Sequence, residues 1–425
     1  MVIYVVKPGD SIYSIAKKYG MSPNKIIRDN EINNVNNLVV GQSLVLLPED
    51  KKYTVIAGDS LYTIAKKFNT TVQSISDVNP SITSPETLSI GQVIIIPSTR
   101  RIGSIEVNGY AYPNINIDVL RKTLSYLTYL SIFNYEVTAN GELIDIPDED
   151  LIKEARNSGV APLMVITNID KGTNFSSDIL HSIFNNEEIQ QKLINNIVSK
   201  LQSKNYYGVN VDFEYVYPED REKYNSFLGE LTKTLNNNGY IVNTAVAPKF
   251  RANQPGILYE SHDYSFQGKT VNHVIIMTYE WGYSYGPPMA VAPINEVSKV
   301  LSYAVTEIPS KKVLMSIPNY GYDWTLPYVK GSAAKTISNT EAIDLAVRTG
   351  ATIQYDENSA SPFFNYYDSL GRGHVVWFED ARSINEKLML INRYNLGGVS
   401  YWTISKYFPQ NWLILNSLYD VKKVI

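Results

Sequence analysis

Two acidic side chains and one amide alternate with apolar residues in a short segment of this chain. Asn210, Asp212 and Glu214 are spaced two apart, with valine or phenylalanine between them. Side chains two apart in a β-strand point from the same face, so the segment predicts a polar row backed by an apolar face. Burying two carboxyl groups together is unfavourable unless they are paired or used in chemistry. We therefore expect Asp212 and Glu214 to be catalytic acids rather than a structural pair.

The strands and helices that must position this row alternate regularly from residue 103 to 425. Amphipathic helical patterns such as 218–238 separate the strands, and there Pro218 suits a first turn and Gly239 an end. Eight strand-then-helix units predict an α/β fold, a (β/α)8 TIM barrel over residues 103–425. Glu214 ends the fourth strand, and the carboxyl ends of the strands carry the active site in such barrels. The expected strands are 104–112, 129–135, 161–168, 208–216, 241–248, 273–281, 313–320 and 398–403.

The interval 325–377 is too long for a plain loop. It contains strand-like pieces at 352–355 and 363–367, and predicts a small insertion after the seventh strand of the barrel.

The first hundred residues contain a repeat. The segment that begins Gly9-Asp10-Ser11 returns almost unchanged from Gly58. Each copy starts with a β-rich stretch, continues through a helical pattern and ends on Gly-Gln, a β-branched run and Pro. The pattern predicts two small β-α-α-β modules at residues 2–48 and 52–97, joined by short polar linkers at 49–52 and 98–101.

Both modules resemble LysM modules, a family that binds glycans containing N-acetylglucosamine. The resemblance implies that the loop entering the first helix of each module contacts the sugar. Asp or Ser before a helix is also a good N-cap, so we expect the side chains of Asp10 and Asp59 to cap and the loop backbone to contact glycan. The loop residues are Gly9, Asp10, Ser11 and Ile12 in the first module and Gly58, Asp59, Ser60 and Leu61 in the second.

The run from Gly208 to Glu214 resembles the signature of family 18 glycoside hydrolases, the chitinases and related β-N-acetylglucosaminidases. Segments 277–279, 317–321 and 397–402 resemble the same family. In that family the 2-acetamido oxygen of the substrate attacks the anomeric carbon, an exception to the two-carboxylate scheme. The resemblance implies that Glu214 is the general acid and base, that Asp212 orients the acetamide, and that Asn210 hydrogen-bonds Asp212.

Four further residues acquire expected roles from the same resemblance. Tyr279 would donate its hydroxyl to the acetamido oxygen, and Trp402 would form the floor of the sugar subsite. Glu280 stands where chitinases often carry Asp and would belong to a subsite, together with Trp281. The first acidic position of the family signature is occupied here by Tyr207.

Composition excludes several other classes of function. A net charge of -4 gives no electrostatic support for nucleic-acid binding. The chain has no Cys, and its four His lack metal-ligand spacing, so we expect neither a metal nor a cofactor. No apolar run approaches the ~18 residues of a membrane span, and the first residues lack the pattern of a signal peptide.

The whole arrangement resembles the spore cortex-lytic N-acetylglucosaminidases of endospore formers. The resemblance implies a peptidoglycan hydrolase that cleaves the β-1,4 bond after N-acetylglucosamine with retention of configuration at the anomeric carbon. It also implies that the enzyme lies in the spore cortex or coat region and arrives there without a classical signal peptide. Its partners would be peptidoglycan and other cortex-lytic enzymes that act on the same substrate. The alternatives are a chitinase or endo-β-N-acetylglucosaminidase acting on chitin or N-glycans, and a non-catalytic glycan-binding protein of a spore layer.

Overall fold

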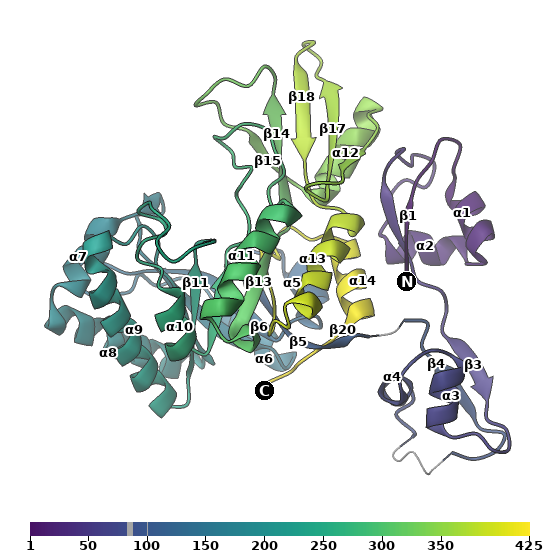
Figure 1. The fold of residues 1–425 in the computed structure, drawn as a ribbon, viewed down its shortest axis with the longest axis horizontal. Helices are drawn as coiled ribbons and strands as arrows, with labels where there is room; N and C mark the ends of the chain where they lie inside the picture. Colours follow the sequence, from purple (N-terminus) through teal and green to yellow (C-terminus); the bar gives the residue numbers. More distant parts are fainter. Residues whose placement is uncertain (83–87, 100) are drawn as a thin grey trace.

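The protein consists of a barrel, an insertion and two N-terminal modules (Figure 1). This architecture comes from a computed structural model, which describes residues 1–82, 88–99 and 101–425. Residues 83–87 of the expected second module and Arg100 of the expected second linker lie outside the described residues.

Eight parallel strands close into the predicted (β/α)8 barrel, which is thereby confirmed. The last strand pairs with the first through Ser400 and Asn108, and a ninth strand, β20 (Tyr419–Val421), adds beside β5. The barrel strands are β5 (Gly103–Ala111), β6 (Tyr129–Glu136), β7 (Ala161–Thr167), β10 (Gly208–Asp212), β11 (Ile241–Val246), β12 (His273–Ile276), β13 (Val313–Pro318) and β19 (Gly398–Trp402).

Most of the helices that surround the barrel bury an apolar stripe against it. In α9 (Arg221–Asn237), Tyr224, Phe227 and Leu228 are among the fully buried residues, at the spacing of one helical face. A short 3₁₀ turn, η2 (Pro218–Asp220), precedes α9, so the expected helix begins as two elements. The other helices of the barrel are α5 (Ile117–Leu124), α6 (Glu149–Asn157), α7 (Ser177–Phe184), α8 (Glu187–Lys204), α10 (Tyr264–Thr270), α11 (Ile294–Glu307), α13 (Ala381–Arg393) and α14 (Pro409–Leu418).

Four barrel strands end two or more residues earlier at their carboxyl ends than the sequence suggested. β10 ends at Asp212, β11 at Val246, β12 at Ile276 and β13 at Pro318. Beyond these residues the backbone leaves the sheet at the mouth of the barrel. Tyr215 and Glu280, both with positive φ, lie beyond the ends of β10 and β12.

The predicted insertion after the seventh strand forms a small antiparallel sheet with one helix, α12 (Asn339–Thr349). It stands above the barrel in Figure 1 and begins earlier than expected, at Tyr320 instead of residue 325. Ala342, Ala346 and Phe364 are fully buried in its core. Its strands are β14 (Tyr320–Thr325), β15 (Lys335–Ser338), β16 (Gln354–Asp356), β17 (Ser361–Tyr367) and β18 (Gly373–Trp377).

Each N-terminal module has the expected β-α-α-β order. A buried asparagine at the end of the second helix holds each module together: Asn30 and Asn79 each donate to one helix carbonyl and exchange bonds with the closing strand. The first module contains β1 (Val2–Val5), α1 (Ile12–Tyr19), α2 (Pro23–Asp29) and β2 (Ser43–Leu46), and the second contains β3 (Lys51–Thr54), α3 (Leu61–Lys67), α4 (Val72–Asp77) and β4 (Val93–Ile96).

The two modules differ in how they join the barrel and its insertion. Val45 of the first module belongs to the barrel core and Val39 belongs to the core of the insertion. The backbone N–H of Ile353 also donates to Val40 of that module. The second module has a core of its own and lies apart from the barrel in Figure 1. The first module is therefore part of one packed body with the barrel.

Candidate active site

The two acidic residues of the polar row lie at the mouth of the barrel. Asp212 is the last residue of β10 and is 5% exposed, and Glu214 is half-buried two residues beyond the strand. Asn210 is fully buried within the strand. On the other face Phe213 stacks on Phe227 of α9, with ring centroids 6.2 Å apart. The predicted alternation of polar and apolar faces is confirmed.

Both carboxyl groups have raised pKa values. Burial raises the pKa of Asp212. Burial, followed by the charges of Asp212 and Glu280, raises the pKa of Glu214 well above its ordinary value. Two neighbouring carboxyl groups in a buried site do not both ionise near neutral pH, so the pair retains a proton. Because burial and the neighbouring charges oppose the ionisation of Glu214 more strongly than that of Asp212, Glu214 is the member of the pair suited to act as a general acid.

The backbone of Glu214 is held on both sides by one buried side chain, Asn168. Asn168 accepts from the Glu214 N–H at 3.0 Å and donates to the Glu214 carbonyl at 2.8 Å. It also donates to the carbonyl of Ser176 at 3.0 Å, and it is fully buried. Asn168 therefore fixes the position of the Glu214 backbone, from which the catalytic side chain extends. Sequence reasoning missed it, although a polar residue at the end of the third predicted strand was a usable signal.

A buried histidine holds the preceding residue. The N–H of Ala247 donates to Nδ1 of His262 at 2.8 Å, so Nε2 carries the proton and donates to the carbonyl of Phe213 at 3.0 Å. Burial lowers the pKa of His262 to about 4, which keeps this neutral tautomer over the working pH range. His262 thus has a structural role, and its bond to the residue before Glu214 makes it part of the support for the site.

The expected hydrogen bond from Asn210 to Asp212 was wrong for this structure. Within the described residues, neither amide atom of Asn210 nor Oδ1 of Asp212 has a partner in hydrogen-bonding geometry. Alternate residues of a strand are separated by about 6.6 Å along the backbone, which is far for two short side chains. Instead the Tyr110 hydroxyl lies close to this row, and burial and the charge of Asp212 raise its pKa well above its ordinary value. Tyr207 packs near Tyr129, ring centroids 6.4 Å apart, before β10 begins.

Aromatic rings line the barrel mouth beside the carboxyl pair. Trp402, at the end of β19, is half-buried, and its ring contacts Tyr110 and Phe133 with centroids 5.3 and 4.9 Å apart. Tyr279 is half-buried, and burial, then the Tyr110, Asp212 and Glu214 groups, raise its pKa well above its ordinary value. A tyrosine in that state keeps its proton and can donate a hydrogen bond.

The insertion supports the part of the site that carries Glu280. Glu280 accepts hydroxyl bonds from Tyr320 and Tyr322 of β14, the second at 3.0 Å. Trp281 is half-buried and its backbone N–H donates to Val291. Trp324 of β14 is buried, at 1% exposed. The structure thus brings Glu280 to the wall of the site through the insertion, a connection that sequence spacing does not reveal.

The loops of the two N-terminal modules share one geometry. Gly9 and Gly58 have φ of 83° and 85°, which favours glycine at both positions. Ser11 and Ser60 are the helix N-caps, each in a capping box. Asp10 and Asp59 do not cap the helices, contrary to our expectation. Their carboxylates accept the hydroxyls of strand tyrosines, at 2.6 Å from Tyr4 and 2.8 Å from Tyr53, because those rings reach across the loop.

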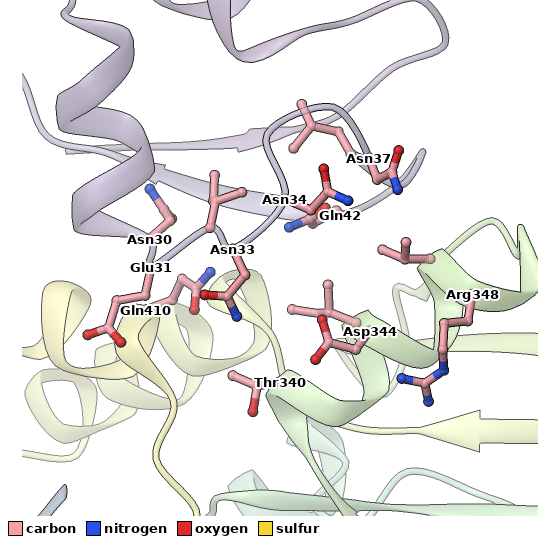
Figure 2. Close-up of a pocket in the computed structure, with 14 residues that line it drawn as sticks. Asn30, Glu31, Asn33, Asn34, Asn37, Gln42, Thr340, Asp344, Arg348 and Gln410 are labelled. Atoms are coloured by element: carbon pink, nitrogen blue, oxygen red, sulfur yellow. The ribbon is translucent and has the colours of Figure 1, made fainter. Parts of the chain in front are cut away.

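A separate pocket of about 250 Å³, lined by both polar and apolar residues, lies where the first module meets the insertion. Figure 2 shows Asn33, Asn34 and Asn37 of the module facing Asp344 and Arg348 of α12. None of the expected catalytic residues lines it. Across the described ranges, no cluster of His, Asp and Glu could hold a metal ion. No described helix has the length and apolar character needed to cross a membrane.

Comparison with known proteins gives matches along the whole chain. Residues 110–406 match the model of glycosyl hydrolases family 18, and residues 4–46 and 53–97 match the LysM domain. The chain is 42% identical to a cortical fragment-lytic enzyme of Bacillus subtilis (strain 168), over 100% of this chain and 99% of that protein. It is 40% identical to a cortical fragment-lytic enzyme of Bacillus anthracis, over 99% of both.

A solved structure shows the same arrangement. The crystal structure of the spore cortex-lytic enzyme SleL of Bacillus megaterium QM B1551 superposes with a TM-score of 0.87 at 42% identity, covering 100% of this chain and 99% of that one. The similarity therefore extends over the modules, the barrel and the insertion together.

Proposed function

Because this chain belongs to glycosyl hydrolases family 18 and carries two LysM domains, we propose that it hydrolyses peptidoglycan of the spore cortex. It is a glycosidase by family, and the finer proposal concerns the bond and the mechanism. The bond is the β-1,4 linkage on the reducing side of N-acetylglucosamine. The substrate is suggested by relatives named cortical fragment-lytic enzymes, which are similar to the chain over their full length.

The first step breaks the glycosidic bond with help from the substrate. The protonated carboxyl of Glu214 gives its proton to the glycosidic oxygen as the bond from that oxygen to C1 breaks. The 2-acetamido oxygen attacks C1 from the other face, which gives an oxazolinium ion and releases the leaving sugar. Asp212, as a carboxylate, accepts the acetamido N–H and stabilises its positive charge. The hydroxyl of Tyr279 donates to the acetamido oxygen and orients it.

The second step returns the enzyme to its starting state. Glu214, now a carboxylate, takes a proton from a water molecule whose oxygen attacks C1. The bond from C1 to the acetamido oxygen breaks, and the product is N-acetylglucosamine with a new reducing end. Two displacements at C1 give net retention of configuration.

The observation that carries this proposal is the buried pair of Asp212 and Glu214, which retains a proton at a barrel mouth lined by Tyr279 and Trp402. Trp402 would stack beneath the sugar whose C1 reacts. Asn210 lies buried within the barrel, before Asp212 on the same strand, and Glu280 and Trp281 would contact neighbouring sugar units. The loops of Gly9-Asp10-Ser11 and Gly58-Asp59-Ser60 would bind the same polymer, and two tethered modules raise its local concentration.

The reducing ends released from purified cortex test the proposal. Digested cortex is reduced with borohydride, and the muropeptides are identified by mass spectrometry. We expect ends derived from N-acetylglucosamine. Ends derived only from muramic acid would contradict the proposed bond. The same preparation on chitin and on an N-glycan separates the peptidoglycan hydrolase from a chitinase or an endo-β-N-acetylglucosaminidase.

We also propose that the enzyme works in the spore and after another enzyme. The names of its relatives refer to cortical fragments, and fragments require a prior cut in intact cortex. A lytic enzyme that opens the polymer would therefore supply the substrate. Activity on intact cortex sacculi equal to that on pre-digested fragments would contradict this order.

A further inference from the structure

A long groove leaves the barrel mouth and passes onto its flank between α5 and α6. Its volume is about 960 Å³, at the upper end of the ~300–1,000 Å³ typical of ligand pockets. Tyr112, which follows β5, and Phe133, within β6, line its inner end. Arg121 and Glu154 of the helices line its outer end. We call this the flank groove.

The inner end of the flank groove joins the candidate active site directly. The ring of Tyr112 contacts Trp402 and Phe133, with centroids 5.9 and 5.5 Å apart, and Phe133 itself contacts Trp402. Burial and the charge of Asp212 raise the pKa of the Tyr112 hydroxyl, which places that group within electrostatic reach of the catalytic pair. A substituent on a sugar next to the one over Trp402 would meet the groove at Tyr112.

The wall of the groove carries both apolar and charged side chains. Beyond the aromatic end lie apolar side chains, among them Ile117 and Ile144, which are 37% and 49% exposed. At the far end, Arg121 forms a bidentate pair with Glu154, with bonds of 2.6 and 3.1 Å that join the two helices. Lys153 and Asp150 of α6 and Glu136 at the end of β6 also line the groove. The groove thus offers aromatic and apolar contacts together with charges of both signs.

We propose that the flank groove receives the short peptide that a muramic residue carries beside the N-acetylglucosamine bound over Trp402. This inference rests on the proposed function, since it takes peptidoglycan as the substrate. A peptide carries apolar side chains and amino and carboxylate groups, which matches the mixture of apolar and charged side chains on the wall. Chitin has no substituent for this space, so the groove would distinguish the two polymers.

A groove-filling variant, Ile144→Trp, tests the inference. Cortex fragments are prepared with their peptides intact, and a second portion is freed of peptide by an amidase that cuts the muramoyl–alanine bond. We expect kcat/KM of Ile144→Trp to fall at least about tenfold more on the peptide-bearing fragments than on the treated ones. Ser203→Trp places the same ring in the neighbouring groove beside α6 and α8, and should leave the ratio of the two activities as in wild type.

The outcomes separate the possibilities. Equal losses on both fragments would overturn the proposal, because the groove would then hold sugar units. No loss on either would overturn it as well. If wild-type enzyme releases no N-acetylglucosamine ends from either fragment, the proposed function fails first, whatever the variant does.

Discussion

Replacing Asn168 by Ala should damage catalysis far more than it damages folding. The change removes the acceptor for the Glu214 N–H and the donors to the Glu214 and Ser176 carbonyls. Leaving such buried groups without partners lowers the free energy of unfolding by about 1–3 kcal/mol. The loop of Glu214 is then free to shift, and a displacement of about 1 Å at a reacting group lowers the rate by about 10²-fold.

The chain offers a matched control in Asn30→Ala. Asn30 is 3% exposed and makes the same three kinds of bond, at 3.0, 2.8 and 2.8 Å, within the first module. Both variants are compared by thermal unfolding and by kcat and KM on short soluble cortex fragments. We expect similar losses of stability, with a large fall in kcat for Asn168→Ala alone.

The pH profile adds a measurement that a purely structural role would not change. If Asn168 positions Glu214 in its buried environment, its loss lets water reach the carboxyl, and the upper limb of the kcat profile moves to lower pH. Equal kcat values for the two variants, with unaltered profiles, would refute the positioning argument.

Three further predictions follow from the same geometry. Asp212→Asn removes the charge that helps raise the pKa of Glu214, so the general acid loses its proton at lower pH. The upper limb of the pH profile of kcat/KM should therefore move to lower pH, and a limb at the wild-type pH would show that the two groups do not interact. Glu214→Gln should raise the melting temperature at pH 8 but not near pH 4. The pKa of Glu214 is higher in the folded than in the unfolded protein, so the stability of the wild type falls as the pH rises above the ordinary carboxyl pKa of ~4.3. A gain in melting temperature that is independent of pH would contradict this linkage. Gly58→Ala places a side chain at a φ of 85°, which strains the loop of the second module. Retention on insoluble peptidoglycan should therefore fall, while kcat on soluble fragments stays unchanged. If the variant sediments with the polymer as the wild type does, this loop does not take part in binding.

Periodicity in the sequence was sufficient for the barrel and for the polar row. The alternation around Asp212 and the apolar stripe of α9 both depend on local spacing, and both are found in the structure. The ends of the strands were not predictable in the same way. The apolar alternation continues past Asp212 because Phe213 is buried against helices, although the backbone has already left the sheet.

The contacts around Glu214 could not be obtained from spacing. The position of Asn168 at the end of a predicted strand marks it as a candidate, but Asn168 and His262 both bind backbone groups, and such bonds leave no pattern of residue types. The same reason explains why Asp10 was expected to cap a helix: its partner Tyr4 is on a strand, and only the folded module brings the two together. Val45 of the first module is buried in the barrel core, a contact that only the folded chain makes.

The most direct test of the account is the turnover of Glu214→Gln on soluble cortex fragments, measured beside its affinity for the same fragments. General acid and base catalysis contributes about 10²–10⁴-fold, so we predict a loss of kcat in that range with binding retained. Turnover equal to that of the wild type would contradict the central claim that Glu214 transfers the proton.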